Sequence, residues 1–294
     1  MNKNDIKFRG IMRVFTVDLY DYFKLARPEN AKALLTGYVL EPYPDYCQNR
    51  TRPAMLVIPG GGYGHVSNRE KEPMALKFVS ESFNAFTLEY SVSPVGHPAQ
   101  LIEACMAMLY IRENAKELHV IPDKISAIGF SAGGHLCSML ATMFDDDAVK
   151  KVFGDKYLLC RPDAVVLSYP VITSGEGVTH GGSFKVLAGD NQELKDSLST
   201  ENRVKENTPP AFIWATFTDN AVPVENSLLM ANAYRKAGIP FELHVYSHGP
   251  HGLSLVNLET ACIGREDHVD TAIQTWFNLA ITWLKKNGFE LQNN

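Results

Sequence analysis

The sequence predicts a single α/β domain in which a mostly parallel sheet is covered by helices on both faces. Three observations lead to this expectation. Short apolar runs alternate along the chain with longer segments of helical spacing. The runs are apolar at consecutive positions, as in strands that are buried on both faces. Glycine or proline follows several of the runs closely, which is typical of a strand that ends in a turn.

The regular pattern begins near Pro53. Residues 1–50 are mixed in character, and we expect them to form an N-terminal extension with the first strands. Strands are expected at 54–58, 85–90, 124–129, 164–169, 211–216 and 241–246. Helices are expected at 71–82, 97–118, 132–144, 224–237 and 269–286.

Residues 171–208 interrupt this alternation with a glycine-rich, polar stretch. A loop of that length inside a compact domain usually carries function or is disordered. We therefore expect a small cap-like insertion over the sheet. Within 1–294 no internal repeat and no long linker separates a second domain.

Composition restricts the class of partner. The chain has 294 residues, of which 45% are hydrophobic and 21% charged, so it can bury a sizeable core. With a formal net charge of -5 and scattered basic residues, nucleic-acid binding is not expected. No apolar run approaches the roughly 18 residues of a membrane helix. The composition leaves a monomer and a homo-oligomer open.

The cysteines favour a reducing compartment. There are five of them, without a CxxC pair, and the odd total argues against a full disulfide framework. The N-terminus lacks the apolar core of a secretory signal. We therefore expect a cytoplasmic protein with buried, reduced thiols at Cys47, Cys105, Cys137, Cys160 and Cys262.

The pentapeptide Gly129-Phe130-Ser131-Ala132-Gly133 matches the pattern G-x-S-x-G. It follows an expected strand and opens an expected helix, which is the context that the motif requires. Glycines on both sides of Ser131 allow the close backbone approach of a sharp turn. The helix N-terminus favours negative charge beside the serine. The motif therefore predicts Ser131 as a nucleophile.

A nucleophilic serine needs N–H groups aimed at the oxygen that becomes negative. One should come from Ala132, the residue after the nucleophile. The glycine-rich turn Pro59-Gly60-Gly61-Gly62-Tyr63 follows an earlier expected strand, and we assign the other donors to Gly61 and Gly62. A phosphate cradle is the competing interpretation of such a turn, but the P-loop lysine is missing.

The order of the chain selects the acid and the base. In this type of sheet the acid follows the nucleophile and the histidine comes last. His251 lies between Pro250 and Gly252 after the last expected strand, so it is the predicted base, with His248 as the alternative. His268 is expected at the surface. Asp219 follows the 211–216 strand and can orient the imidazole, so it is the predicted acid.

These motifs together resemble the esterase/lipase group of α/β-hydrolases, which includes acetylxylan esterase-like and feruloyl esterase-like carbohydrate esterases. The resemblance covers the chain from about Pro53 to the last helix. It rests on the motifs above and on further segments that match in order: 69–73, 134–136, 208–210, 222–227 and 249–252. The sequence departs from the HGGG motif common in esterases, because Pro59 stands in place of the histidine.

The resemblance implies an α/β-hydrolase fold and a cofactor-free, metal-free hydrolase. Its substrate would be a short acyl ester, such as an acetyl group on an oligosaccharide. Tyr63, His180 and Phe184 are then candidates for the lining of the substrate pocket.

Two other functions stay open at this stage. A serine peptidase acting on small peptides would use the same three residues. A catalytically silent member could bind a sugar, although all three residues are present. A metal hydrolase is disfavoured, because no HExxH motif accompanies His248 and His251.

Overall fold

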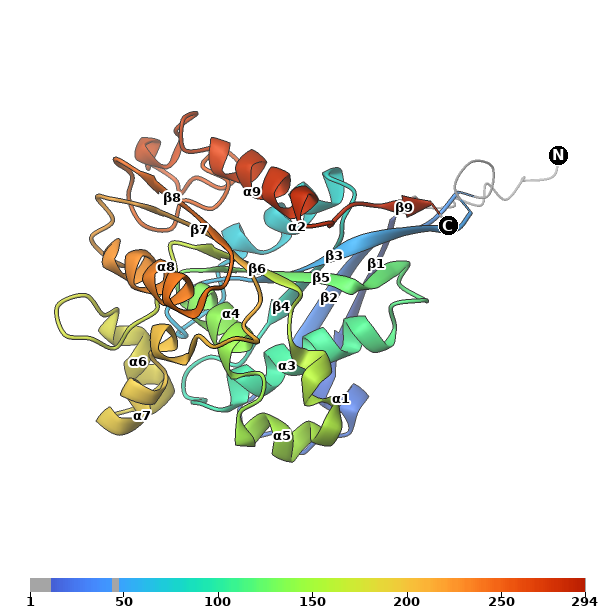
Figure 1. Ribbon diagram of the computed structural model, residues 1–294, viewed down its shortest axis with the longest axis horizontal. Helices are drawn as coiled ribbons and strands as arrows, with labels where there is room; N and C mark the ends of the chain where they lie inside the picture. Colours follow the sequence, from blue (N-terminus) through green and yellow to red (C-terminus); the bar gives the residue numbers. More distant parts are fainter. Residues whose placement is uncertain (1–11, 44–47, 294) are drawn as a thin grey trace.

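The computed structural model of the chain describes residues 12–43 and 48–293, and a twisted sheet runs through its centre (Figure 1). Eight strands follow the spatial order β1-β2-β4-β3-β5-β6-β7-β8, and β9 pairs with β3. β2 is antiparallel to β1 and β4, and β9 to β3, whereas the other neighbours are parallel. The strands are β1 (Met12–Asp18), β2 (Leu34–Leu40), β3 (Arg50–Ile58), β4 (Asn84–Glu89), β5 (Val120–Phe130), β6 (Ala164–Ser168), β7 (Ala211–Thr216), β8 (Phe241–Tyr246) and β9 (Gln292–Asn293).

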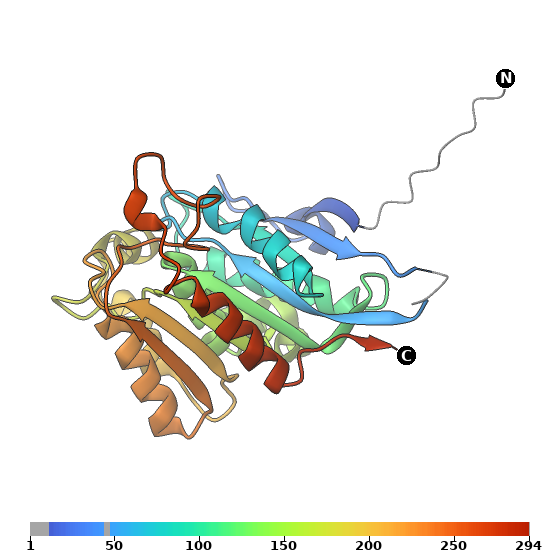
Figure 2. The ribbon, with the colours of Figure 1, turned by 90° about the horizontal axis from the view of Figure 1, so that it is seen from above.

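Helices cover both faces of the sheet, as Figure 1 and Figure 2 show. The helices are α1 (Leu19–Phe23), α2 (Glu72–Ser80), α3 (Ala99–Glu113), α4 (Ala132–Met143), α5 (Asp147–Phe153), α6 (Gly181–Ala188), α7 (Gln192–Ser197), α8 (Glu225–Ala237) and α9 (Thr275–Lys286). Short 3₁₀ turns are η1 (Asn68–Glu70), η2 (Gly154–Cys160), η3 (Thr200–Arg203) and η4 (Glu266–His268). The predicted α/β fold with a mostly parallel sheet is confirmed.

The core has two halves, one on each face of the sheet. Along β3, Ala54, Leu56 and Ile58 face the half that α3, α4 and α8 cover. Met55 and Val57 face the half that α2 and α9 cover. Because successive side chains of a strand point to opposite faces, a strand between two helical layers is apolar at every position.

All six predicted strands are present, and β7 and β8 have the predicted bounds. β1 and β2 lie in the stretch for which no strand bounds were predicted. β1 is an edge strand whose side chains are partly exposed, so its sequence has no continuous apolar run. Its pairing partner β2 joins it to β4 over a long register, which the local sequence does not reveal.

The insertion 171–208 is more regular than its composition suggests, because it contains α6 and α7. Both helices are short, and each begins with a side-chain cap: His180 accepts the N–H of Ser183, and Asn191 accepts that of Leu194. Such short helices show no clear helical periodicity in the sequence. The role of this insertion as a cap stays a prediction.

The thiols of Cys105, Cys137 and Cys160 are free and buried, and that of Cys262 is free and half-buried. Cys47 lies outside the described residues. Over 12–43 and 48–293, none of the helices combines the length and the apolar character needed to cross a bilayer. The cytoplasmic location stays a prediction.

Helix α4 packs backbone against backbone on the end of β3. A Cβ atom at Gly133 would lie 2.3 Å from the carbonyl oxygens of both Ile58 and Pro59. We therefore expect Gly133→Ala to lower the free energy of unfolding by about 3 kcal/mol, because main chain cannot move aside as a side chain can.

Gly181→Ala is the matched control, because no heavy atom lies within 4 Å of the added Cβ. It should leave stability unchanged or raise it by about 0.5 kcal/mol. Urea unfolding of both variants measures the difference. A Gly133→Ala protein as stable as the control would contradict this packing argument.

Candidate active site

Ser131 lies at the turn between β5 and α4, at the carboxyl edge of the sheet. Its backbone has φ 53° and ψ −120°, a strained conformation for a residue with a side chain. Its N–H donates to the carbonyl oxygen of Ser168, and its own carbonyl accepts the N–H of Val171. The neighbouring β6 segment therefore holds the strained turn in place.

A continuous hydrogen-bonded chain links Ser131, His251 and Asp219. The Ser131 hydroxyl lies 2.7 Å from Nε2 of His251, and His251 Nδ1 lies 2.6 Å from Oδ2 of Asp219. The three residues follow β5, β8 and β7, whose carboxyl ends meet at one edge because the strands are parallel. The structure thus brings together the three residues that the motifs select.

Asp219 is held by main chain as well as by the imidazole. Its Oδ1 accepts the N–H groups of Ala221 and Val222 at 3.0 and 2.9 Å. Its side chain is completely buried. Because main-chain N–H groups hold Oδ1 while Oδ2 faces the imidazole, the carboxylate can orient His251 without rotating.

The loops after β7 and β8 are tied together near this pair. Thr216 and Thr218 donate from their hydroxyls to the carbonyl oxygen of Gly249, at 2.8 and 3.1 Å. The Gly249 N–H returns a bond to the Thr218 hydroxyl at 2.9 Å. The loop that carries His251 is therefore fastened to the loop that carries Asp219.

The other late histidines lie elsewhere. His248, the alternative base, is exposed, and its Nε2 lies 2.9 Å from Asp270. The prediction that His268 lies at the surface is wrong, because it is only 3% exposed. Its Nδ1 accepts the N–H of Cys262 and lies within 3.3 Å of Arg69. Burial, followed by the positive charge of Arg69, lowers the pKa of His268.

Three amides in the glycine turn and at the start of α4 have no hydrogen-bond partner among the described residues. The N–H groups of Gly61, Gly62 and Ala132 donate to no acceptor among residues 12–43 and 48–293. Gly61 and Gly62 have φ values of 124° and 62°, which glycine adopts readily. A Cβ at Gly60 would lie 3.0 Å from that of Ser131, so the glycine turn starts directly against this serine.

Tyr63 does not line an open pocket, so this prediction is wrong. Its side chain is fully buried, and its hydroxyl lies 2.9 Å from Nδ1 of His135. Because His135 Nε2 lies 2.8 Å from the carbonyl of Leu198, Nε2 carries the proton and Nδ1 accepts from Tyr63. Burial lowers the pKa of His135 to about 4, which keeps the ring neutral. The contact was not recognised because it joins side chains that are distant in sequence.

Phe184 and His180 come from the insertion. The Phe184 ring is buried, packs edge-on to His135 at 5.1 Å and borders a cavity of about 360 Å³ within the insertion. His180 lies over the glycine turn, because a Cβ at Gly62 would be 3.6 Å from its Cε1. Burial, and then the nearby imidazole of His251, lowers the pKa of His180. Of the three predicted lining residues, His180 is the one placed beside His251.

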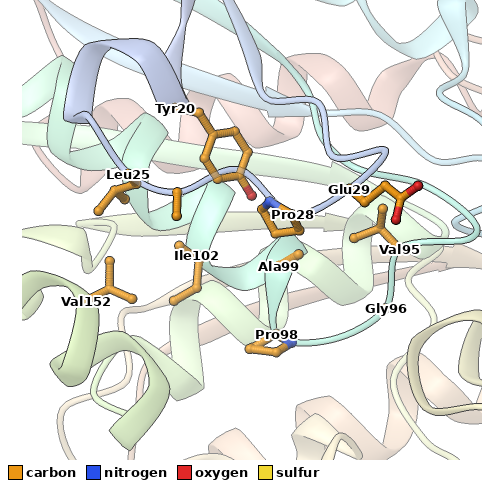
Figure 3. Close-up of a pocket in the computed structure, with 11 residues that line it drawn as sticks. Tyr20, Leu25, Pro28, Glu29, Val95, Gly96, Pro98, Ala99, Ile102 and Val152 are labelled. Atoms are coloured by element: carbon orange, nitrogen blue, oxygen red, sulfur yellow. The ribbon is translucent and has the colours of Figure 1, made fainter.

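An apolar cavity of about 590 Å³ lies between α1 and the start of α3, walled by Tyr20, Ile102 and Val152 among others (Figure 3). No member of the Ser131–His251–Asp219 chain and no residue of the glycine turn borders it. It is therefore separate from the candidate site.

Comparison with known proteins identifies the family. The family profile described as BD-FAE matches residues 42–234. The chain belongs to the BD-FAE family. It is 44% identical to endo-1,4-beta-xylanase B of Butyrivibrio fibrisolvens over 71% of this chain and 33% of that protein. It is 30% identical to an acetylxylan esterase of Xylanibacter ruminicola over 78% of this chain and 45% of the relative. The chain thus spans less than half the length of these two curated relatives.

Solved structures of similar extent also match this BD-FAE chain. An acetyl ester-xyloside bifunctional hydrolase from Caldicellulosiruptor lactoaceticus is 39% identical, with a TM-score of 0.80 over 95% of this chain and 98% of that one. The carboxylesterase Cest-2923 from Lactobacillus plantarum is 26% identical, with the same TM-score and coverage. The α/β-hydrolase fold and the esterase family of the predicted resemblance are therefore confirmed.

Metal binding was not expected from the sequence. Within the described part of the chain, no three side chains of His, Cys, Asp or Glu gather closely enough to hold a metal ion. The absence of cofactor, metal, nucleic-acid and membrane partners stays a prediction, as does the oligomeric state.

The buried neutral His135 makes stability depend on pH. Its pKa is about 4 when folded and about 6.5 when exposed, so between these values the unfolded chain binds a proton that the native protein does not. Stability is therefore lost as the pH falls below about 6.5. We expect this group to remove about 2 kcal/mol between pH 7.5 and 5.

His135→Gln provides the comparison, because an amide can replace both hydrogen bonds of the ring without titrating. Urea unfolding at pH 7.5 and 5 should show a smaller pH effect in the variant by about that amount. Equal pH effects in both proteins would mean that His135 does not titrate as described.

Proposed function

We propose that this protein is a serine carboxylic ester hydrolase with Ser131 as nucleophile, His251 as general base and Asp219 as the orienting acid. The observation that carries the proposal is the chain of two short hydrogen bonds from the serine hydroxyl to the buried carboxylate. The esterases among its relatives support the same class of reaction.

The geometry suits acyl transfer in two stages. The Ser131 hydroxyl adds to the ester carbonyl while its proton passes to Nε2 of His251. Asp219 stabilises the resulting imidazolium. The proton then moves to the departing alcohol oxygen as the carbon–oxygen bond breaks, leaving an acyl-serine. Water, deprotonated by His251, releases the acid and restores the serine.

The oxygen of the ester carbonyl becomes negative in both stages. The unpartnered amides of Gly61, Gly62 and Ala132 are assigned to it as the oxyanion hole. Preorganised donors of this kind contribute strongly because they need not reorient during the reaction. The N-terminus of α4 adds a favourable dipole at the same place.

The substrate we propose is a short acyl ester, namely an acetyl group carried by a sugar. Two similar proteins bear names that refer to acetyl esters of xylan or xylosides. His180 is assigned to the alcohol portion. Its Nδ1 accepts the Ser183 N–H, so in the neutral ring the proton lies on Nε2. That nitrogen bonds to no described residue and can donate to a sugar oxygen.

Replacing the nucleophile tests the reaction class. We expect Ser131→Ala to lower hydrolysis of p-nitrophenyl acetate by about 10⁴-fold or more, since the nucleophile of the acyl-enzyme is lost. Ser138→Ala is the matched control: Ser138 also lies buried on α4 but bonds to His135 and Thr200. The control should retain activity within about threefold. A Ser131→Ala enzyme as fast as the control would refute the mechanism.

Replacing His180 tests its role in substrate binding. We expect His180→Phe to lower kcat/KM for an acetylated xyloside by about 10-fold, because one hydrogen bond to the substrate is lost. For p-nitrophenyl acetate the loss should stay within about threefold, since no sugar oxygen is present. Steady-state kinetics on both esters in the same preparation provides the measurement. An equal loss on both substrates would contradict a role in sugar recognition.

A further inference from the structure

The dipeptide Arg69–Glu70 belongs to a segment that matches the esterase family, yet neither residue enters the reaction described above. It ends the short turn η1, which follows the glycine turn and precedes α2. Glu70 is 3% exposed, so its carboxylate has left water almost completely. A buried carboxylate is costly unless its oxygens accept hydrogen bonds. Its partners therefore indicate what it does.

Each carboxylate oxygen of Glu70 is bound by a different loop of the candidate site. Oε2 accepts the Gly60 N–H at 2.8 Å, at the start of the glycine turn. Oε1 accepts the Tyr169 hydroxyl at 2.7 Å, just after β6. Hydrogen bonds to a carboxylate are about twice as strong as those between neutral groups. One side chain thus fixes the turn that carries Gly61 and Gly62 relative to the end of β6.

Tyr169 extends this connection to the histidine loop. Its hydroxyl accepts the N–H of Ser254 at 2.9 Å while it donates to Glu70. Its ring packs edge-on to the imidazole of His251 at 5.2 Å. Burial, and then the negative charge of Glu70, raises the pKa of Tyr169, so the hydroxyl stays protonated and keeps donating. Tyr169 therefore contacts both Glu70 and His251 and connects them.

Arg69 holds the other side of the same histidine loop. Its Nη2 donates to the carbonyl oxygen of Gly252, directly after His251, and its Nε donates to that of Thr260, both at 2.5 Å. Its main-chain carbonyl accepts the Ser254 hydroxyl at 2.8 Å. A planar guanidinium presents such donors in a rigid fork, which lysine cannot reproduce.

The two side chains do not neutralise each other. Over the described ranges 12–43 and 48–293, no ion pair within 4.0 Å involves Arg69 or Glu70. Their hydrogen bonds go instead to main chain, to the phenol of Tyr169 and to the imidazole of His268. A role as a surface ion pair would therefore not explain the hydrogen bonds of either residue. An apolar side chain at position 70 would leave the Gly60 N–H without its acceptor.

We propose that Glu70 and Arg69 are positioning residues for catalysis: Glu70 fixes the oxyanion turn against Ser131, and Arg69 fixes the loop that carries His251. The inference rests on the proposed function, because it needs Ser131 and the glycine turn to be the reacting centre. Neither side chain touches the substrate. Their effect on rate comes from the placement of groups that do.

The chain contains a matched control for each residue. Glu103 is also buried, and it accepts the Ser91 N–H at 2.7 Å and the Tyr20 hydroxyl at 2.8 Å. Tyr20 in turn lines the separate cavity of Figure 3. Arg161 donates from Nε to the Asn207 carbonyl at 2.6 Å, before β6 and thus at the opposite edge of the sheet. Like Glu70 and Arg69, these two side chains bond to main chain or to a phenol, but they bond to none of Ser131, His251 and Asp219.

The test compares Glu70→Gln and Arg69→Lys with Glu103→Gln and Arg161→Lys in the full-length chain. On p-nitrophenyl acetate we expect kcat of the first two to fall about 10- to 100-fold with KM within about threefold, since small displacements of reacting groups have effects of this size. The two controls should keep kcat within about twofold of the unmodified enzyme. Thermal unfolding shows how much stability each variant loses.

Binding of phenylboronic acid separates positioning from stability. The boronate forms a tetrahedral adduct with the serine, so its Ki should rise in Glu70→Gln by a factor similar to the loss of kcat/KM. In Arg69→Lys, labelling of Ser131 by a fluorophosphonate should slow in parallel with kcat. If Glu70→Gln does not fold, Tyr169→Phe removes the same hydrogen bond from the other partner and should lower kcat about threefold or more.

The outcomes distinguish this inference from the proposed function. Unmodified enzyme that hydrolyses the ester, with Glu70→Gln and Arg69→Lys as active as their controls, would overturn the positioning role alone. Unmodified protein that neither hydrolyses esters nor reacts with the fluorophosphonate would overturn the proposed function and this inference together.

Discussion

The close packing of α4 against the ends of β3 and β5 is the constraint on which the candidate site depends. It places the start of the helix, with Ser131 and Ala132, beside the turn that carries Gly61 and Gly62. Backbone meets backbone there, because Gly133 has no Cβ to hold the chains apart. Ser131 and the amides of Gly61, Gly62 and Ala132 are therefore positioned by main chain, which has little freedom to adjust.

The second half of the site is built differently. His251 and Asp219 stand on loops after β8 and β7, and side chains fasten these loops to each other and to the rest of the protein. The insertion is joined to the first half through His135, which bonds to Tyr63 and to the Leu198 carbonyl. Since this ring stays neutral in a dry environment, both bonds keep a fixed direction. The insertion is thereby anchored to the helix that presents Ser131.

Where the requirement was local, the sequence selected residues that the structure brings together. A strand, a sharp turn and a helix select Ser131 within a few residues, and chain order then selects Asp219 and His251. Sequence reasoning failed where the requirement was a distant contact. His268 and Tyr63 were misplaced because their burial depends on Arg69 and His135, which no local pattern connects to them. The bond from Arg69 to Gly252 spans 183 residues.

The same distinction explains why the Arg69–Glu70 segment matched a family without revealing a role. A motif shows that residues of given types occur at given spacings, but the function of Glu70 lies in the pair of loops that its two oxygens join. Buried polar networks contribute little net stability, because desolvation offsets much of their hydrogen bonding. This network instead fixes the positions of the loops after β3, β6 and β8 relative to one another. Ser131 is hydrogen-bonded both to the segment after β6 and to His251 after β8, so fixing these loops relative to each other matters more for the site than the stability that an apolar side chain would add.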